Sequence, residues 1–425
     1  AACGSDEESS QEETESLSCS EVYPLSGALA TGTTSTGLYD TVTPFEHADV
    51  ERSHVYRADF AGSVTDPASN TVDTFAFSGT HESPYNIVTR DPDEVFLFGG
   101  TQGDQDEALG PYVAKFDAGT GEVLWRTDLR NTKELGEFLW PGLVTAHGNG
   151  DLYAIHGSRI ARLDASTGAV KGEVELPVPQ GTDRADIHFN GFTVLRSGTI
   201  VTKSFGRPDG CTAQGTDVIA ECVTDETPHP PSILVAVDSE SLSVIDSFQL
   251  DQGSSGRITS GLFGARELIY VPGDENFVRF ELVAGELVID ELWSVDDYLE
   301  PGETPASAPA IMGDWIVFQT NSGLSTAPLS VHAVAQEDSS NRLRTVPFTP
   351  STLGFSAIPS ALTVDPETLR IYAMDAIRGQ VASLELVDGN SLEVRWIVDQ
   401  FTLHHTSLVG PPEARVFVGT DAPGV

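Results

Sequence analysis

The sequence predicts an all-β protein, a closed ring of seven sheets with four short antiparallel strands in each. Stretches 113–125 (VAKFDAGTGEVLW) and 160–172 (IARLDASTGAVKG) align with each other, and the same strand–turn–strand form recurs along the chain. The 425 residues include 40 Gly and 25 Pro, which favours many turns. No 12-residue stretch has a clean helical periodicity. Repeats of roughly 40–50 residues with four strands each are typical of β-propeller blades.

Each repeat ends in an outer hairpin, in which an apolar strand, a turn and a second strand follow one another. In the first two hairpins an Asp (Asp117, Asp164) precedes the turn, and a Gly (Gly121, Gly168) supplies the left-handed position. The six outer hairpins span 112–129, 159–176, 233–250, 277–295, 329–348 and 381–398.

An inner strand pair precedes each outer hairpin, again as two apolar strands around an Asp, Gly or Pro turn. The six inner pairs span 83–100, 141–157, 189–205, 258–273, 307–321 and 359–375. Each repeat therefore supplies the four strands of one blade. Residues 131–139 (NTKELGEFL) are expected to form a short helical turn between two blades.

The two ends of the repeat array predict how the ring closes. Residues 406–419 form one further inner pair without an outer hairpin, whereas residues 54–79 form a hairpin without an inner pair. We expect the N-terminal hairpin to complete the last blade, because closure removes exposed sheet edges. Six whole blades and one shared blade make seven.

The net charge of −41, from 64 acidic and 23 basic residues, restricts the partners. Such a field repels nucleic-acid phosphates and anionic lipids, so neither is expected as a main partner. No run of about 18 apolar residues is present that would span a bilayer.

The first residues, Ala1-Ala2-Cys3-Gly4, resemble the end of a bacterial lipoprotein signal, where lipid is attached to the Cys. Residues 5–20 are rich in Ser and acidic residues and are expected to form a self-repelling tether. The resemblance implies an exported protein of the cell envelope or cell surface, attached through Cys3. We expect a tether over 1–25, an irregular lead-in over 26–53 and the propeller over 54–425, with an insertion at 204–231.

Three further Cys residues remain. Cys211 and Cys222 share the Gly- and Pro-rich insertion, and in an exported protein this spacing predicts a disulfide. Cys19 is either free or paired with Cys3 if Cys3 carries no lipid. No Cys/His spacing typical of structural zinc is present.

The pattern D-x-x-T-G-x-x-x-W at Asp117, Thr120, Gly121 and Trp125 resembles the repeat of PQQ-type propellers. That family includes quinoprotein dehydrogenases and the propeller lipoprotein of outer-membrane assembly. The second repeat has Gly172 in place of the Trp, and later repeats lose the Thr-Gly pair. The resemblance implies the fold and leaves the function open. PQQ itself is not expected, because the family's adjacent cysteines are missing.

Polar residues at the starts of the inner strands form the candidate ligand site, since these strands meet at the central channel. A transition metal would use His81, His188 and His404. Alternatively, Asn86, Asp186 and Asn190 could imitate the calcium site of lactonase-like propellers. The alternative is that these side chains are hydrogen-bonded packing residues. The candidate residues are His81, Glu82, Asn86, Asp186, His188, Asn190, His404 and His405.

Two functions from different classes follow. The first is a lipid-anchored, monomeric scaffold of the cell envelope that binds a small molecule or an envelope protein. The alternative is a metal-dependent propeller enzyme, hydrolase- or lactonase-like, at the channel mouth; whether the protein is an enzyme stays open. A third reading is a subunit of a larger surface assembly. Lys203 and Arg207 would catch an anionic ligand, or else pair with Asp209 or Asp217.

Overall fold

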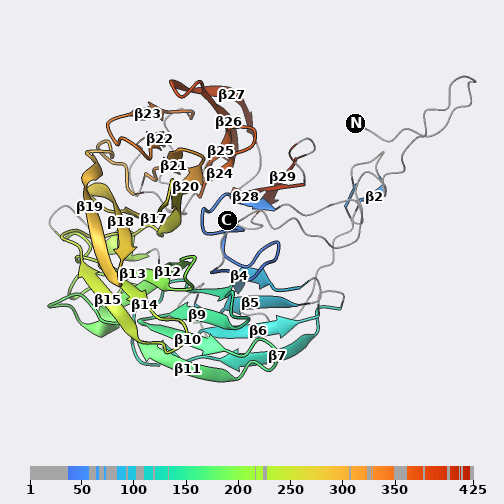
Figure 1. The fold of residues 1–425 in the computed structure, drawn as a ribbon, viewed down its shortest axis with the longest axis vertical. Coiled ribbons are helices and arrows are strands. Elements are labelled where there is room, and N and C mark those ends of the chain that lie inside the picture. The colour runs from blue at the N-terminus through green and yellow to red at the C-terminus, as the bar shows by residue number, and fades with distance from the viewer. Residues whose placement is uncertain are drawn as a thin grey trace, which may run out of the picture.

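The computed structural model describes most of the chain from residue 37 to residue 421. The described ranges are 37–56, 64–66, 71–72, 84–91, 94–101, 110–117, 120–132, 134–215, 217–223, 227–305, 308–322, 327, 329–348, 361–376, 379–399, 403–410, 412 and 415–421. Among these residues the chain is almost entirely β, and seven sheets follow one another around a ring (Figure 1). The predicted seven-bladed β-propeller is thereby confirmed.

Each of the first three blades is a four-stranded antiparallel sheet whose strands run from the axis to the rim in sequence order. Blade 1 contains β4 (Pro84–Thr89), β5 (Val95–Gly99), β6 (Tyr112–Phe116) and β7 (Val123–Asp128). Blade 2 contains β8 (Leu143–Ala146), β9 (Leu152–His156), β10 (Arg159–Leu163) and β11 (Val170–Glu175). Blade 3 contains β12 (Ile187–Val194), β13 (Ile200–Gly206), β14 (Ile233–Val237) and β15 (Val244–Gln249).

Blades 4 to 6 repeat the same order of strands. Blade 4 contains β16 (Thr259–Phe263), β17 (Arg266–Pro272), β18 (Asn276–Val283) and β19 (Glu286–Asp296). Blade 5 contains β20 (Ala310–Met312), β21 (Trp315–Gln319), β22 (Val331–Ala335) and β23 (Arg342–Thr345). Blade 6 contains β24 (Thr363–Asp365), β25 (Arg370–Asp375), β26 (Gln380–Val387) and β27 (Ser391–Asp399).

The seventh blade joins the two ends of the chain, as predicted, but in a different arrangement. Strand β28 (Leu403–Val409) pairs with β29 (Val416–Asp421) on its outer side and, in parallel, with β1 (Val55–Tyr56) on its inner side. The expected outer hairpin is thus corrected to an inner strand, because the chain arrives from the ring axis and meets the axial edge of β28 first. Strands β2 (Val64–Asp66) and β3 (Thr71–Val72) pair with each other in a separate two-stranded sheet.

The Asp at the start of each early hairpin turn has a definite structural role. Asp117 Oδ1 accepts hydrogen bonds from the backbone N–H and the hydroxyl of Thr120, at 2.7 and 2.9 Å. Asp164 holds Thr167 in the same way. Gly121 and Gly168 then take a φ of 73°, the left-handed region that favours glycine. The repeated sequence therefore encodes a repeated turn.

Residues 37–56, which we call the inner belt, run along the inner strands of the ring. Backbone carbonyls of the inner belt accept hydrogen bonds from the inner strands of six blades, at Thr89, Ala146, Ser260, Ile311, Val364 and Leu408. In the one remaining blade, blade 3, Phe192 packs on Phe45 of the inner belt at 6.0 Å between ring centroids. The segment expected to be an irregular lead-in therefore contacts every blade from the axial side.

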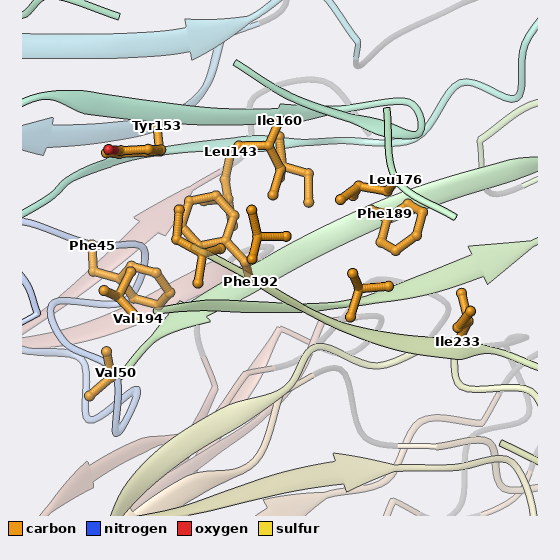
Figure 2. Packing of buried hydrophobic residues seen from close by; sticks show 14 of the residues in the cluster. Phe45, Val50, Leu143, Tyr153, Ile160, Leu176, Phe189, Phe192, Val194 and Ile233 are labelled. Carbon is orange, nitrogen blue, oxygen red and sulfur yellow. The ribbon is translucent and has the colours of Figure 1, made fainter. Parts of the chain in front are cut away.

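The hydrophobic core lies in the seams between neighbouring blades. Figure 2 shows the seam between blades 2 and 3, where Leu143 and Ile160 face Phe189 and Phe192. Phe45 of the inner belt, together with Val50, joins the same cluster from the axis. Alternate residues of each strand face the two neighbouring blades, so every sheet is buried on both sides along its inner half.

The insertion between β13 and β14 packs against residues 138–140, which lead into blade 2, and against Phe205 of blade 3. Its Cys211–Cys222 disulfide confirms the predicted staple, and helix α2 (Asp217–Glu221) lies within it. Its apolar side chains pack with Phe138, Trp140 and Phe205 in a separate cluster. In the segment 131–139, where a short helical turn was expected, the Leu135 N–H donates to the carbonyl of Asn131 four residues earlier at 3.4 Å, and the described residues form turns without a longer helix. The 3₁₀-helix η1 (Arg184–Asp186) precedes β12 instead.

Candidate functional site at the ring axis

The predicted channel-mouth residues can be traced only in part. His81 and Glu82 lie outside the described residues, and of His404 and His405 only the strand, β28, is described. The proposed metal set of His81, His188 and His404 therefore stays a prediction. Within the described part of the chain, no group of three or more His, Cys, Asp or Glu side chains is arranged to hold a metal ion.

His188 lies on β12, with 1% of its surface exposed. Its ring meets Phe138 edge to face at 6.4 Å between centroids. Burial lowers the pKa of His188 to about 3, and the nearby His156, Arg257 and Lys203 act in the same direction. The imidazole is therefore neutral at physiological pH and is a packing residue at the described contacts.

Asn86 and Asp186 both make structural hydrogen bonds. The Asn86 side chain exchanges two hydrogen bonds with the backbone of Val144, at 2.9 and 3.0 Å, and so joins blade 1 to blade 2. Asp186 accepts a hydrogen bond of 2.7 Å from the Arg207 guanidinium. The expectation that Arg207 forms a local ion pair thus holds, with Asp186 as the partner in place of Asp209 or Asp217.

Asn190 and Lys203 face the seam between blades 3 and 4. In β12, Phe189 pairs with Ser204 and Phe192 pairs with Thr202 of β13. The register shift between these two pairs places Asn190 in a bulge beside Lys203. The Asn190 amide donates to the carbonyl of Ser255 at 2.7 Å, and Lys203 Nζ donates to the carbonyl of Ser254. Burial holds the pKa of Lys203 well below its usual range. Both side chains therefore fix the loop that precedes β16.

The strongest charge cluster at the axis joins the inner belt to two blades. The carboxylate of Glu46 contacts Arg52 Nη1 at 2.8 Å and Arg257 Nε at 3.0 Å. The hydroxyl of Tyr85 donates to Glu46 at 2.9 Å and accepts from Arg257. Arg52 also donates to the carbonyl of Ile258 at 2.9 Å. We call Glu46, Arg52, Tyr85 and Arg257 the axial cluster.

The protonation states of the axial cluster follow from burial and charge. Burial opposes ionisation of Glu46, but the Arg257 and Arg52 guanidiniums outweigh it and hold its pKa below the usual range. Burial raises the pKa of Tyr85, so its hydroxyl stays protonated and can donate. A buried carboxylate between two guanidiniums is the arrangement in which ion pairs retain their charge.

The backbone around the axial cluster is strained. Four non-glycine residues of the inner belt have a positive φ: His47 at 64°, Ala48 at 77°, Arg52 at 55° and His54 at 58°. Such conformations persist only where surrounding contacts impose them. The rings of His47 and His54 lie 4.0 Å apart between centroids. The strain follows from a tight fold-back between Glu46 and Arg52, which brings both side chains to one point.

Sequence reasoning missed half of the axial cluster. Arg257 and Tyr85 stand at inner-strand starts, where polar residues were expected to meet, but Glu46 and Arg52 belong to the lead-in. A signal is present in residues 46–54, EHADVERSH, where acidic, basic and His residues crowd into nine positions. In a segment that packs against seven blades, such charges must pair with one another or with the ring.

No family model matches the chain, and no curated protein matches it in sequence. Solved structures of similar fold include BamB from Moraxella catarrhalis, at 13% identity and a TM-score of 0.42 over 75% of this chain and 77% of that one. Hydrazine synthase of Kuenenia stuttgartiensis matches at 12% identity and a TM-score of 0.47, over 81% and 99%. The C-terminal WD40 domain of Sif2 matches at 10% identity and 0.48, over 80% and 82%. The fold assignment stands on the strand pairing described above.

Proposed function

We propose that the protein is an exported, lipid-anchored β-propeller scaffold that binds a partner protein on the outer surface of its ring. The observation that carries the proposal is the inner belt, which occupies the inner face of all seven blades. Its axial cluster consists of mutually paired side chains. The side chains of the axial cluster are therefore engaged within the protein, and the groups accessible to a partner protein lie on the outer surface of the ring.

The rim carries the features of a protein-binding surface. Apolar side chains are exposed on the outer strands of five blades, and Leu292 on β19 is 95% exposed. Outer strands also present unpaired backbone groups that can bind extended segments. The exposed apolar residues used below are Leu124, Val170, Ile245, Leu292 and Ile397.

Export and lipid attachment at Cys3 rest on the sequence Ala1-Ala2-Cys3-Gly4 and the acidic segment that follows. The Cys211–Cys222 disulfide is consistent with an oxidising compartment. A relation to PQQ-type propellers is supported by the repeated Asp turn of the first hairpins. The domain limits of 1–25, 26–53 and 54–425 belong to the same proposal.

The scaffold is tested by site-specific photocrosslinking of the full chain in its native cells. A benzoylphenylalanine introduced at each of the five exposed rim positions is expected to give a discrete adduct with another protein from at least one blade. The same residue at Val50, which is buried in the inner belt, serves as the control and should give no intermolecular adduct. Absence of adducts at all five rim positions would contradict the proposal.

A further inference from the structure

At the seam between blades 3 and 4 a carboxylate stands where the seam between blades 1 and 2 has an indole. In blade 1 the indole of Trp125 packs against the next turn, so closely that a Cβ on Gly168 would lie 2.6 Å from it. The equivalent position, paired at the same place in the hairpin, is Gly172 in blade 2 and Asp246 in blade 3. Leu242 of blade 3 packs over Gly172. Asp246 takes the place of the indole in this seam, and large side chains pack beside it: Phe248 lies on Phe280 of blade 4 at 5.0 Å between ring centroids.

A groove of about 710 Å³ opens at this seam, between β15 of blade 3 and β19 of blade 4. These outer strands are neighbours on the left of the ring (Figure 1). Asp246 bridges the seam by accepting a hydrogen bond of 2.8 Å from the backbone N–H of Leu287. Apolar groups line the groove on Phe248, Leu287, Val288 and Ile289. The floor of the groove consists of these four apolar residues, and the other residues that line it are polar or charged.

The rim of the groove is acidic. Asp290 and Glu281 are held by guanidiniums, through Arg279 and Arg266 at 2.8 and 2.9 Å. Glu286 and Glu291 are exposed and form no ion pair with a described residue. Five carboxylates and one guanidinium line the groove, which leaves an excess of negative charge over an apolar floor. The carboxylates in the groove are Asp246, Glu281, Glu286, Asp290 and Glu291.

We infer that this groove binds an extended segment of the partner protein in which apolar and basic residues alternate. The inference rests on the proposed scaffold function and names the partner's chemistry. In an extended segment, successive side chains point to opposite sides, so apolar groups can enter the floor while Lys or Arg meets Glu286 and Glu291. Charge complementarity selects this occupant over an acidic segment, which the groove and the whole protein repel.

The test measures binding of a fluorescent peptide of about ten alternating Lys and Leu residues to the full chain by anisotropy. The wild type is expected to bind, and the affinity should fall when salt is raised, because the rim contacts are exposed. Glu286→Lys with Glu291→Lys should weaken binding at least tenfold. Asp246→Trp, which restores the side chain of blade 1 and fills the groove, should weaken it to a similar degree.

A matched control separates the groove from the general charge of the protein. Glu122→Lys with Glu337→Lys makes the same change in net charge at exposed positions outside the groove and should alter affinity less than twofold. A second peptide, with Ser in place of Leu, should bind at least tenfold more weakly than the Lys/Leu peptide.

Equal losses in the control and groove variants, or wild-type binding in both groove variants, would overturn the inference. No binding of the Lys/Leu peptide by the wild type would overturn it as well. None of these results touches the scaffold proposal, which the photocrosslinking adducts at the other blades test separately.

Discussion

The ring axis and the seam between blades 3 and 4 both gather carboxylates, but they hold them in opposite ways. At the axis Glu46 is buried between two guanidiniums and a tyrosine hydroxyl. At the seam Glu286 and Glu291 are exposed at the edge of a groove with both apolar and acidic lining residues. The difference teaches that charge at the axis holds the inner belt in the ring, whereas charge at the rim remains available to a partner.

The largest change in the free energy of unfolding is expected for a substitution in the axial cluster. Glu46→Gln leaves Arg52 and Arg257 buried without their counter-charge, so the free energy of unfolding should fall by about 3–5 kcal/mol. Urea denaturation at neutral pH measures this loss, with Glu286→Gln as the rim control. A loss below about 1 kcal/mol for Glu46→Gln would mean that the axial cluster does not hold the inner belt.

A smaller effect is expected when the blade 3 residue is transferred to the blade 1 seam. Trp125→Asp removes the indole that packs against Gly168 and Phe96, and should lower the free energy of unfolding by about 2–3 kcal/mol. The reciprocal Asp246→Trp adds a side chain to an open groove but removes the acceptor of the Leu287 N–H, so it should lower the free energy of unfolding by only about 1 kcal/mol. Equal losses in the free energy of unfolding for the two variants would show that the seam between blades 3 and 4 is packed as tightly as the seam between blades 1 and 2.

The buried histidines at the inner part of the ring should make stability fall with acid. The pKa of His188 is about 3 in the folded protein, below the ordinary value of about 6.5 expected after unfolding, so the unfolded chain takes up the proton first. Stability is therefore lost as the pH falls from about 7 towards 3, by about 2 kcal/mol between pH 7 and pH 5 for this one group.

The measurement compares urea denaturation of the wild type and His188→Gln at both pH values. The variant should lose that share of the pH dependence, and His332→Gln in blade 5, where burial also lowers the pKa to about 3, should lose a similar share. An unchanged pH dependence in both variants would show that these imidazoles are not buried as described.

Much of the fold follows from the sequence, because each blade repeats a local pattern. The Asp–Thr–Gly turns at residues 117–121 and 164–168 specify their own hairpins through hydrogen bonds within five residues. The stapled insertion followed from two cysteines in one loop. These features are local, so no knowledge of distant contacts was needed.

The inner belt and the axial cluster could not be derived in the same way. Residues 37–56 have no strand pattern of their own, and their conformation depends on carbonyl groups that meet six blades and on Phe45, which meets blade 3. Glu46 and Arg257 are more than 200 residues apart, so only the closed ring brings them together. The parallel pairing of β1 with β28 has the same origin, since it depends on where the inner belt leaves the axis.

The smallest change in the free energy of unfolding is expected for substitutions at the acidic edge of the groove. Glu286→Lys with Glu291→Lys should change the free energy of unfolding by less than about 1 kcal/mol, because exposed substitutions without fixed partners have little effect. Thermal melting of this variant beside the wild type measures it. A large loss would place these carboxylates in the framework of the ring and remove the contrast with the axis.

The central claim, that the inner belt fills the inner face of the ring, is tested most directly by hydrogen exchange of single amides. The N–H groups of Ser260, Ile311 and Val364 donate to the inner belt at 3.2, 2.9 and 3.0 Å. They should exchange only through global unfolding, at the rate of the slowest strand amides. Exchange as fast as that of exposed turn amides would show that the inner belt leaves the axis in solution, and the account would be contradicted.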